Sequence, residues 1–292
     1  MSTDQQWDIV TGVGMTALAV AAGRAIESGK PDPLMTDPYA RALVNAAQPD
    51  TPMPTAWDGL DAETGPEADM WQTTSEYIGV RSRVFDDYLT GAAGEGVTQL
   101  VILASGLDTR AFRLPWPSGT RCFELDQPAV LDFKLETLAA EGAAPRCEHR
   151  PVRVDLRDDW GSALEEAGFD RDRPTAWLAE GLLPYLPPEA EAHLFKEITR
   201  LSAPGSRLSV EQINDITGAL DDPMMKETSD NLGLGLESLF PEGERTSVDA
   251  QLSALGWSLR HSPAPESAAR YGRTLTASTL FSERIVHTFG EL

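Results

Sequence analysis

Between residues 99 and 212, short apolar runs alternate with longer segments in which apolar residues recur at helical spacing. The predicted strands are residues 99–104, 120–126, 150–155, 175–180 and 206–212, and the predicted helices begin near Thr109, Pro128, Asp158 and Pro188. Strands and helices that alternate with short connections are typical of a parallel sheet covered on both faces. The pattern therefore predicts an α/β fold with a Rossmann-like sheet and helices on both of its faces.

The first 95 residues have a different pattern, which predicts an N-terminal helical cap. Apolar residues from Met15 to Ile26 recur at helical spacing, and a second helix is expected to begin at Asp37–Pro38. Residues 48–69 contain four prolines, six acidic residues and no lysine or arginine, so we expect a flexible loop there. Residues 77–93 then predict a helix that leads into the core.

The C-terminal part predicts how the sheet is completed. Residues 213–250 are irregular and rich in glycine, methionine and leucine, and we expect them to form a lid insertion. Residues 252–263 and 281–290 are predicted to supply one helix and two closing strands. We therefore expect residues 1–95 to form the cap with its acidic loop, and residues 96–292 to form the core, the two together making structurally one domain.

Composition narrows the class of protein and its partners. The chain has 292 residues, 41% of them hydrophobic, and no apolar run approaches the roughly 20 residues that a membrane span needs. A net charge of −22 disfavours nucleic acid and anionic lipid as partners. Two cysteines and no basic-then-apolar N-terminal segment favour a cytoplasmic location. The sequence leaves the oligomeric state open.

The turn after the first predicted strand indicates the kind of ligand. It contains a single glycine, Gly106, whereas a pyrophosphate-binding turn needs three spaced glycines. Asp108 would also repel a phosphate. Asp126 ends the second strand twenty residues after Gly106, where a carboxylate can accept both hydrogens of a ribose diol. Glu124 on the same strand face is the alternative ribose ligand, and Asp126 could instead only cap the next helix. A ligand with a ribose and no phosphate, such as S-adenosylmethionine, fits this turn.

The third and fourth predicted strands also end in candidate ligands. Asp155 could accept a hydrogen bond from an adenine amino group while Leu156 covers the ring, although Asp155 followed by a helix cap is common without a ligand. Glu180 is an acid that closes an apolar strand. A buried carboxylate is paired or functional, so Glu180 is expected either to hold the ammonium group of the ligand or to pair with an arginine.

Four segments in this order and spacing carry a resemblance to a known family: LVILASGLDTRAFRL, FELDQPAVLDFK, VDLRDDW and LAEGLLPYL. They closely resemble the leucine carboxyl methyltransferase-like family, and most of all its actinobacterial branch of S-adenosylmethionine-dependent methyltransferases, which is related to tetracenomycin-type polyketide O-methyltransferases. The N-terminal residues 15–40, VRSRVFDDYL and the late RYGR resemble that branch too. The resemblance implies a class I methyltransferase sheet with S-adenosyl-L-methionine as cofactor.

The resemblance also implies roles for individual residues. Gly106 would let the cofactor lie against the turn, and Asp126 would hold the ribose. Asp155 and Leu156 would contact the adenine end, and Glu180 the amino-acid end. Arg83 matches the arginine that holds the cofactor carboxylate, with Arg81 as the alternative and Arg24 as a further basic residue nearby. Where the family often has its first turn glycine, this chain has Ala104, whose methyl group fits if the residue has ordinary extended geometry.

The resemblance and the residues together predict an S-adenosyl-L-methionine-dependent methyltransferase. No general base is evident near the strand ends, and the four histidines are scattered and match no metal site. We therefore expect O-methylation of a small-molecule carboxylate or acidic hydroxyl, since a carboxylate is already ionised at neutral pH. Tyr185, Trp57 and Met224–Met225 are candidates for the acceptor pocket. The alternatives are a non-catalytic protein that binds S-adenosylmethionine and a nicotinamide-dependent oxidoreductase, which the single-glycine turn disfavours.

Overall fold

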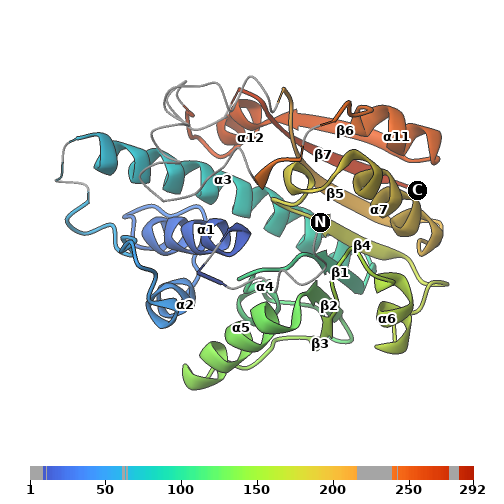
Figure 1. The fold of residues 1–292 in the computed structure, drawn as a ribbon, viewed down its shortest axis with the longest axis horizontal. Helices are drawn as coiled ribbons and strands as arrows, with labels where there is room; N and C mark the ends of the chain where they lie inside the picture. The colour runs from blue at the N-terminus through green and yellow to red at the C-terminus, as the bar shows by residue number, and fades with distance from the viewer. Residues whose placement is uncertain are drawn as a thin grey trace.

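A seven-stranded sheet lies at the centre of the computed structural model (Figure 1). The structure describes residues 9–10, 12–60, 63, 65–215, 239–241, 243–275 and 283–292. The strands are β1 (Gln99–Leu103), β2 (Arg121–Asp126), β3 (Glu148–Arg153), β4 (Thr175–Ala179), β5 (Arg207–Ile213), β6 (Ser258–Pro263) and β7 (Ile285–Glu291). No helix in these described ranges is long and apolar enough to span a membrane.

The strand order places a topological switch point at β1. The order in the sheet is β3-β2-β1-β4-β5-β7-β6, so β1 lies between β2 and β4. Strands β1 to β5 are parallel to one another, whereas β7 runs antiparallel to both β5 and β6. Ligands of open α/β sheets bind at the carboxyl ends of the strands where the order reverses. The topology therefore directs attention to the ends of β1, β2 and β4.

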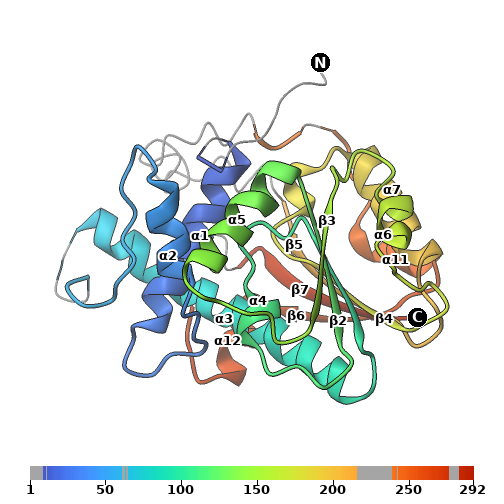
Figure 2. The same ribbon diagram turned by 90° about the horizontal axis from the view of Figure 1, so that it is seen from below.

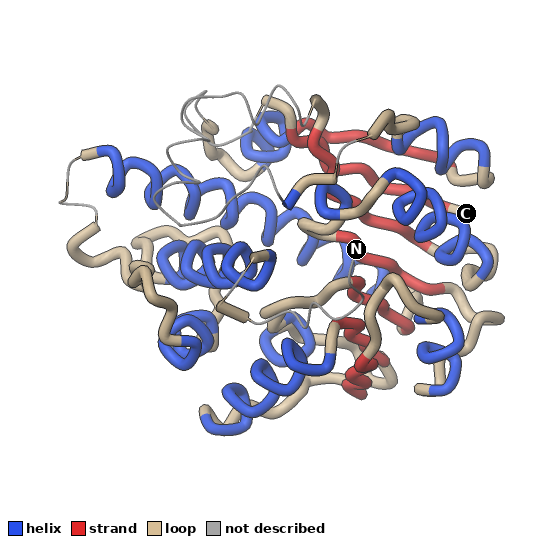
Figure 3. Tube along the Cα trace, viewed as in Figure 1, coloured by secondary structure: helices blue, strands red, loops and turns tan. Residues whose placement is uncertain are grey.

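Helices cover both faces of the sheet, as predicted from the sequence (Figures 2 and 3). Leu100 and Ile102 pack on one face with α3 (Pro66–Gly94) and α12 (Ala264–Arg270). Val101 and Leu103 pack on the other with α6 (Trp160–Glu166), α7 (Pro188–Arg200) and α11 (Val248–Ala254). This alternation follows from the two-residue period of a strand, and it explains why β1 is apolar throughout. The helices of the core are α4 (Arg110–Arg113), α5 (Pro128–Ala140), α6 (Trp160–Glu166), η1 (Leu183–Tyr185), α7 (Pro188–Arg200), α11 (Val248–Ala254) and α12 (Ala264–Arg270).

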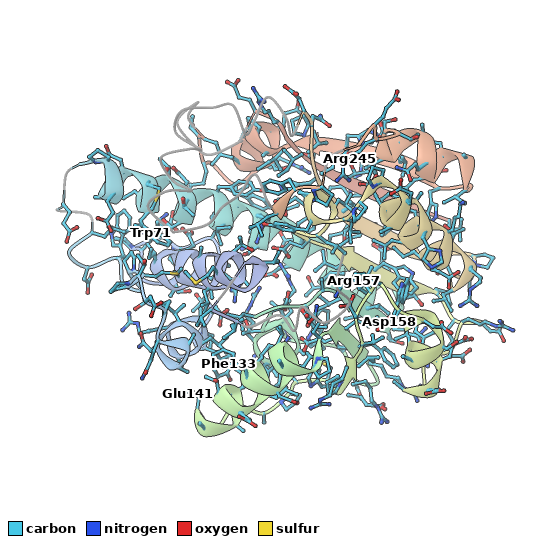
Figure 4. All side chains as sticks on the ribbon, in the orientation of Figure 1. Trp71, Phe133, Glu141, Arg157, Asp158 and Arg245 are labelled. Atoms are coloured by element: carbon cyan, nitrogen blue, oxygen red, sulfur yellow. The ribbon has the colours of Figure 1, made fainter. Side chains whose placement is uncertain are left out.

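Three N-terminal helices pack together beside the sheet: α1 (Val13–Ser28), α2 (Ala40–Ala47) and α3 (Pro66–Gly94). Their shared apolar cluster contains Leu18, Leu43 and Trp71, and Figure 4 shows Trp71 far from the strands. Leu107 from the turn after β1 and Val130 from α5 belong to the same cluster. The N-terminal helices are thereby attached to the edge of the sheet where the strands end.

The predicted α/β class is confirmed, and each of the five strands expected between residues 99 and 212 is present. Helix α3 begins at Pro66, eleven residues before the predicted start, so the end of the expected 48–69 loop is helical. Helix α12 was not predicted. Most of the expected 213–250 lid lies outside the described residues, and the division of the chain at residue 95 stays a prediction.

One buried histidine gives the fold a pH dependence. His287 on β7 is fully buried, with the Ser267 hydroxyl 2.9 Å from its Nδ1 atom and the Tyr77 ring stacked on it. Burial lowers the pKa of His287 to about 4. An unfolded histidine titrates near 6.5, so between these two values the unfolded chain binds more protons than the folded one. The folded state is therefore destabilised as the pH falls through this window.

We expect His287→Gln to lose this dependence. Lowering the pH from 7.5 to 5 should remove about 2 kcal/mol more from the unfolding free energy of the parent protein than from that of the variant. Urea unfolding of both proteins at both pH values measures the difference. Identical pH dependences would contradict the presence of a neutral, desolvated imidazole at this position.

Candidate functional site

The turn between β1 and α4 has an unusual backbone. Ala104 and Gly106 both have φ of +48°, in the left-handed region that favours glycine. The extended geometry that the sequence analysis required of Ala104 is therefore absent at this residue. An alanine in the left-handed region costs roughly 1–2 kcal/mol. The turn is held by Ser105, whose N–H donates to the carbonyl of Leu125 at 2.9 Å. A Cβ on Gly106 would lie 3.5 Å from Ala17, so α1 covers this turn.

Among the described residues, only backbone N–H groups donate hydrogen bonds to Asp126 at the end of β2. Its Oδ2 accepts from the N–H of Gly106 at 2.6 Å, and its Oδ1 accepts from the N–H of Gln127 at 2.7 Å. Burial raises the pKa of Asp126. The N-cap residue of α5 is Gln127, so Asp126 is not simply the helix cap. A half-buried carboxylate with no cation partner retains acceptor capacity for a further donor.

Glu124, the alternative to Asp126, already pairs through its Oε2 atom in the interior. Its Oε2 lies 2.9 Å from Nζ of Lys134 and 2.7 Å from Nε2 of His149. Burial would raise the pKa of Glu124, but Lys134 and His149 hold it below its usual value. Lys134 also donates to the Ser105 hydroxyl at 3.1 Å, so this buried group supports the turn after β1 from behind. Sequence reasoning missed this support, although an acid within the apolar run CFEL is an indication of it.

Glu180 at the end of β4 lies between two arginines. Its Oε1 is 2.7 Å from Nε of Arg81 on α3, and its Oε2 is 2.7 Å from Nη1 of Arg110 on α4. Nη1 of Arg81 in turn lies 3.1 Å from Glu211 on β5. The arginine pairing considered for Glu180 from the sequence is present, and the side chain still borders the cavity described below.

Arg83, the sequence-based candidate for the cofactor carboxylate, lies elsewhere. Its side chain is 45% exposed, and it pairs with Asp87 at 2.9 Å and donates to the carbonyl of Leu34 at 3.3 Å. It does not line the cavity, whereas Arg81, the alternative, does. Arg24 lines the cavity as well, and its guanidinium pairs with Asp37 at 2.9 Å and donates to the carbonyl of Leu107 at 2.6 Å.

Asp155 and Leu156 follow β3 and border the same cavity. The Asp155 carboxylate accepts from Nε2 of Gln127 at 3.0 Å and pairs with Arg157 at 2.6 Å. These contacts hold the end of β3 against the start of α5. Hydrogen bonds from Arg157 lower the pKa of Asp155, although partial burial opposes them.

A cavity of about 740 Å³ connects these groups at the carboxyl ends of β1, β2 and β4. Its size is within the range of roughly 300–1,000 Å³ that is typical of pockets for small organic ligands. Of the sequence-predicted site residues, all but Arg83 line it: Gly106, Asp126, Asp155, Leu156 and Glu180. The structure therefore brings together five residues that come from four different strand ends.

The candidate residues for an acceptor pocket do not all lie at the cavity. Tyr185 lines the cavity. Trp57 does not, and instead lies 5.2 Å from Nζ of Lys30 by the N-terminal helices. Met224–Met225 fall outside the described residues.

Comparison with known proteins identifies the family. Residues 17–199 match the model of the leucine carboxyl methyltransferase family, which is more than half of the chain. The chain belongs to the leucine carboxyl methyltransferase family. A protein from Saccharopolyspora erythraea named "Putative S-adenosyl-L-methionine-dependent methyltransferase" is 51% identical over 276 residues, which cover 94% of each chain. A protein of the same name from Mycolicibacterium gilvum is 48% identical, over 93% of this chain and 91% of its own.

Solved structures agree with this family on the fold. A crystal structure described as a putative methyltransferase from Thermobifida fusca superposes with a TM-score of 0.52 at 19% identity, covering 94% of this chain and 93% of that one. A DUF574 family protein from Streptomyces avermitilis superposes with a TM-score of 0.53 at 14% identity, covering 94% and 96%. The resemblance read from the four motifs is confirmed, and the chain is an S-adenosyl-L-methionine-dependent methyltransferase with the class I fold.

Proposed function

We propose that this leucine carboxyl methyltransferase family member binds S-adenosyl-L-methionine in the cavity and methylates a carboxylate or acidic hydroxyl oxygen of a small molecule. The observation that carries the cofactor assignment is Asp126. It is a half-buried carboxylate at the end of β2, it borders the cavity, and no lysine or arginine among the described residues pairs with it. A ribose diol supplies the donors that such a carboxylate lacks.

The other cavity residues fit the remaining parts of the same ligand. Gly106 presents a turn without a side chain, and Asp155 with Leu156 provides an acceptor and an apolar surface for an adenine. Glu180 would hold the ammonium group of the amino-acid end. We assign the carboxylate of that end to Arg81 instead of Arg83. The described contacts of Arg81 use its Nε and Nη1 atoms, which leaves Nη2 as a donor.

The bound cofactor supplies an electrophilic methyl group, which forms a bond to the acceptor oxygen while the electron pair of the broken carbon–sulfur bond stays on sulfur, so that S-adenosylhomocysteine is released. The protein would hold the acceptor oxygen in line with that methyl group and exclude water. Among the described residues that line the cavity there is no histidine and no lysine. A carboxylate oxygen needs no base because it is ionised at neutral pH, and this supports an acidic acceptor.

Titration of the rate tests the acceptor assignment. The purified protein would first be screened with S-adenosylmethionine against small organic acids, phenols and alcohols for release of S-adenosylhomocysteine. With the best acceptor at saturation, the rate should vary less than about twofold between pH 6 and 9, because a carboxylate stays ionised over that range.

The same titration of Tyr185→Phe serves as the control, since Tyr185 is a phenol at the cavity and burial raises its pKa. The variant should show the same flat profile. A rate that rises tenfold per pH unit near neutrality would contradict a carboxylate acceptor. A rise that disappears in Tyr185→Phe would identify this phenol as the proton acceptor.

A further inference from the structure

We infer that the acceptor is an apolar molecule with a single negative charge, and that Tyr185, with the Phe240 ring stacked on it, forms the wall against which its apolar body lies. This inference rests on the proposed function, because it describes the part of the cavity beyond the residues assigned to the cofactor. It adds the class of acceptor and the residues that select it.

Three segments far apart in the sequence build this part of the cavity. Among the described residues, helix α1 contributes one face, the loop around η1 a second, and Leu239 with Pro241 a third. The Tyr185 and Phe240 rings stack with centroids 5.3 Å apart and an interplanar angle of 18°. A Cβ on Gly12 would lie 3.8 Å from Leu239, so the start of α1 meets the third segment. The residues of this part of the cavity that offer apolar surface are Val13, Ala17, Val20, Leu186, Pro187, Leu239 and Pro241.

Polar groups are few in this part of the cavity. The Thr16 hydroxyl already donates to the carbonyl of Val13 at 2.7 Å, and the Tyr185 phenol lies beside it. A polar acceptor body would therefore lose its hydration without finding partners here, and that loss costs free energy. An apolar body gains by the same transfer from water.

The positive charges around the cavity are already compensated. Each of the five arginines that line it, among the residues that the structure describes, has a carboxylate oxygen within 3.1 Å. The pairs are Arg24–Asp37, Arg81–Glu211, Arg110–Glu180, Arg113–Asp86 and Arg157–Asp155. The free donor of Arg81 is assigned above to the carboxylate of the cofactor. Among the described cavity residues no uncompensated arginine charge is then left for the acceptor. Its anionic group would face the sulfonium, and a second anionic group would stay unpaired in a partly buried site.

Calorimetric binding of two matched acids tests this inference. Octanoate and octanedioate have the same chain length and differ by one carboxylate. Both would be titrated into the protein saturated with sinefungin, a cofactor analogue whose amine carries a positive charge where the sulfonium lies. We expect octanoate to bind at least tenfold more tightly than octanedioate. It should also bind at least fivefold more tightly than it does to the complex with S-adenosylhomocysteine, whose sulfur is neutral.

A pair of variants tests the wall. Phe240→Ala should raise the dissociation constant of octanoate at least fivefold and leave that of sinefungin within twofold. Phe133→Ala is the matched control, because Phe133 is also a half-buried phenylalanine outside the cavity lining, but it lies on α5 and not against Tyr185 (Figure 4). This control should leave both constants within twofold.

Each contrary outcome has a definite meaning. Equal or tighter binding of octanedioate would overturn the single charge. Binding of sinefungin without any binding of octanoate would overturn the apolar acceptor while leaving the cofactor assignment intact. Equal effects of the two phenylalanine variants would overturn the role of the ring pair. Failure of sinefungin and S-adenosylhomocysteine to bind would instead overturn the proposed function on which the inference rests.

Discussion

Replacing Asp126 with alanine is expected to weaken the binding of S-adenosylhomocysteine by roughly 1.5–3 kcal/mol, which corresponds to about 10- to 150-fold in the dissociation constant. The variant loses the carboxylate assigned to the ribose. It also loses the acceptor for the N–H groups of Gly106 and Gln127, which join the turn after β1 to the start of α5. Isothermal titration calorimetry of the parent protein and the variant measures the change.

Two further variants separate these effects. Asp126→Asn keeps one acceptor oxygen and nearly the same shape, so it should weaken binding less than Asp126→Ala does. Asp132→Ala removes an exposed carboxylate of α5 that pairs with Arg153, and it should leave the dissociation constant within twofold. Far-ultraviolet circular dichroism and a thermal melt check that each variant folds. Unchanged affinity in a folded Asp126→Ala protein would remove Asp126 from the site.

Arg81→Lys is expected to weaken the binding of S-adenosylhomocysteine by at least about 1.5 kcal/mol, because an ammonium group cannot bind two carboxylates and a ligand with the fixed geometry of a guanidinium. Arg81 contacts Glu180 through Nε and Glu211 through Nη1. Arg83→Lys is the matched control on the same helix. Its exposed pair with Asp87 contributes little, so binding should stay within twofold.

Thermal melts of both lysine variants belong to this comparison. Arg81 is buried between carboxylates, so Arg81→Lys should also lower the melting temperature. Saturating S-adenosylhomocysteine should then raise the melting temperature of the variant by less than it raises that of the parent protein. A purely structural role of Arg81 would leave the ligand-induced increase unchanged. Loss of binding in Arg83→Lys together with normal binding in Arg81→Lys would show that the motif-based choice of Arg83 was the right one.

The sheet could be predicted because its signals are local. A parallel strand buried on both faces is a continuous apolar run such as Leu100 to Leu103, and Pro128 and Pro188 mark helix starts in the sequence. Helix α12 has no such signal: it is seven residues long, directly follows β6, and packs against α3 from the other end of the chain. Short helices of this kind depend on tertiary contacts, which a local pattern does not contain.

The residues that line the cavity could be predicted where a polar residue ends an apolar strand, as Asp126 and Glu180 do. The choice between Arg81 and Arg83 needed the direction of each side chain. Residues two positions apart on a helix differ in direction by about 200°, so Arg81 and Arg83 point to opposite sides of α3. The sequence does contain the deciding signal: Ile78 and Phe85, three residues before and four after Arg81, are apolar, which places Arg81 on the buried face of α3.

Other features of the site depend on the folded backbone. The left-handed geometry of Ala104 contradicts the usual preference of alanine, and it arises only when the turn is closed by the bond from Ser105 to Leu125. The pairing of Glu124 with Lys134 and His149 joins two strands and a helix. Neither could be read from residue spacing, because each depends on which elements become neighbours.

A crystal structure of the complex with S-adenosylhomocysteine tests the central claim most directly. The account predicts the ligand in the cavity at the ends of β1, β2 and β4, with its ribose hydroxyls on the carboxylate of Asp126 and its amino-acid end between Arg81 and Glu180. A ligand bound outside this cavity, or one whose ribose leaves Asp126 bonded only to the N–H groups of Gly106 and Gln127, would contradict the account.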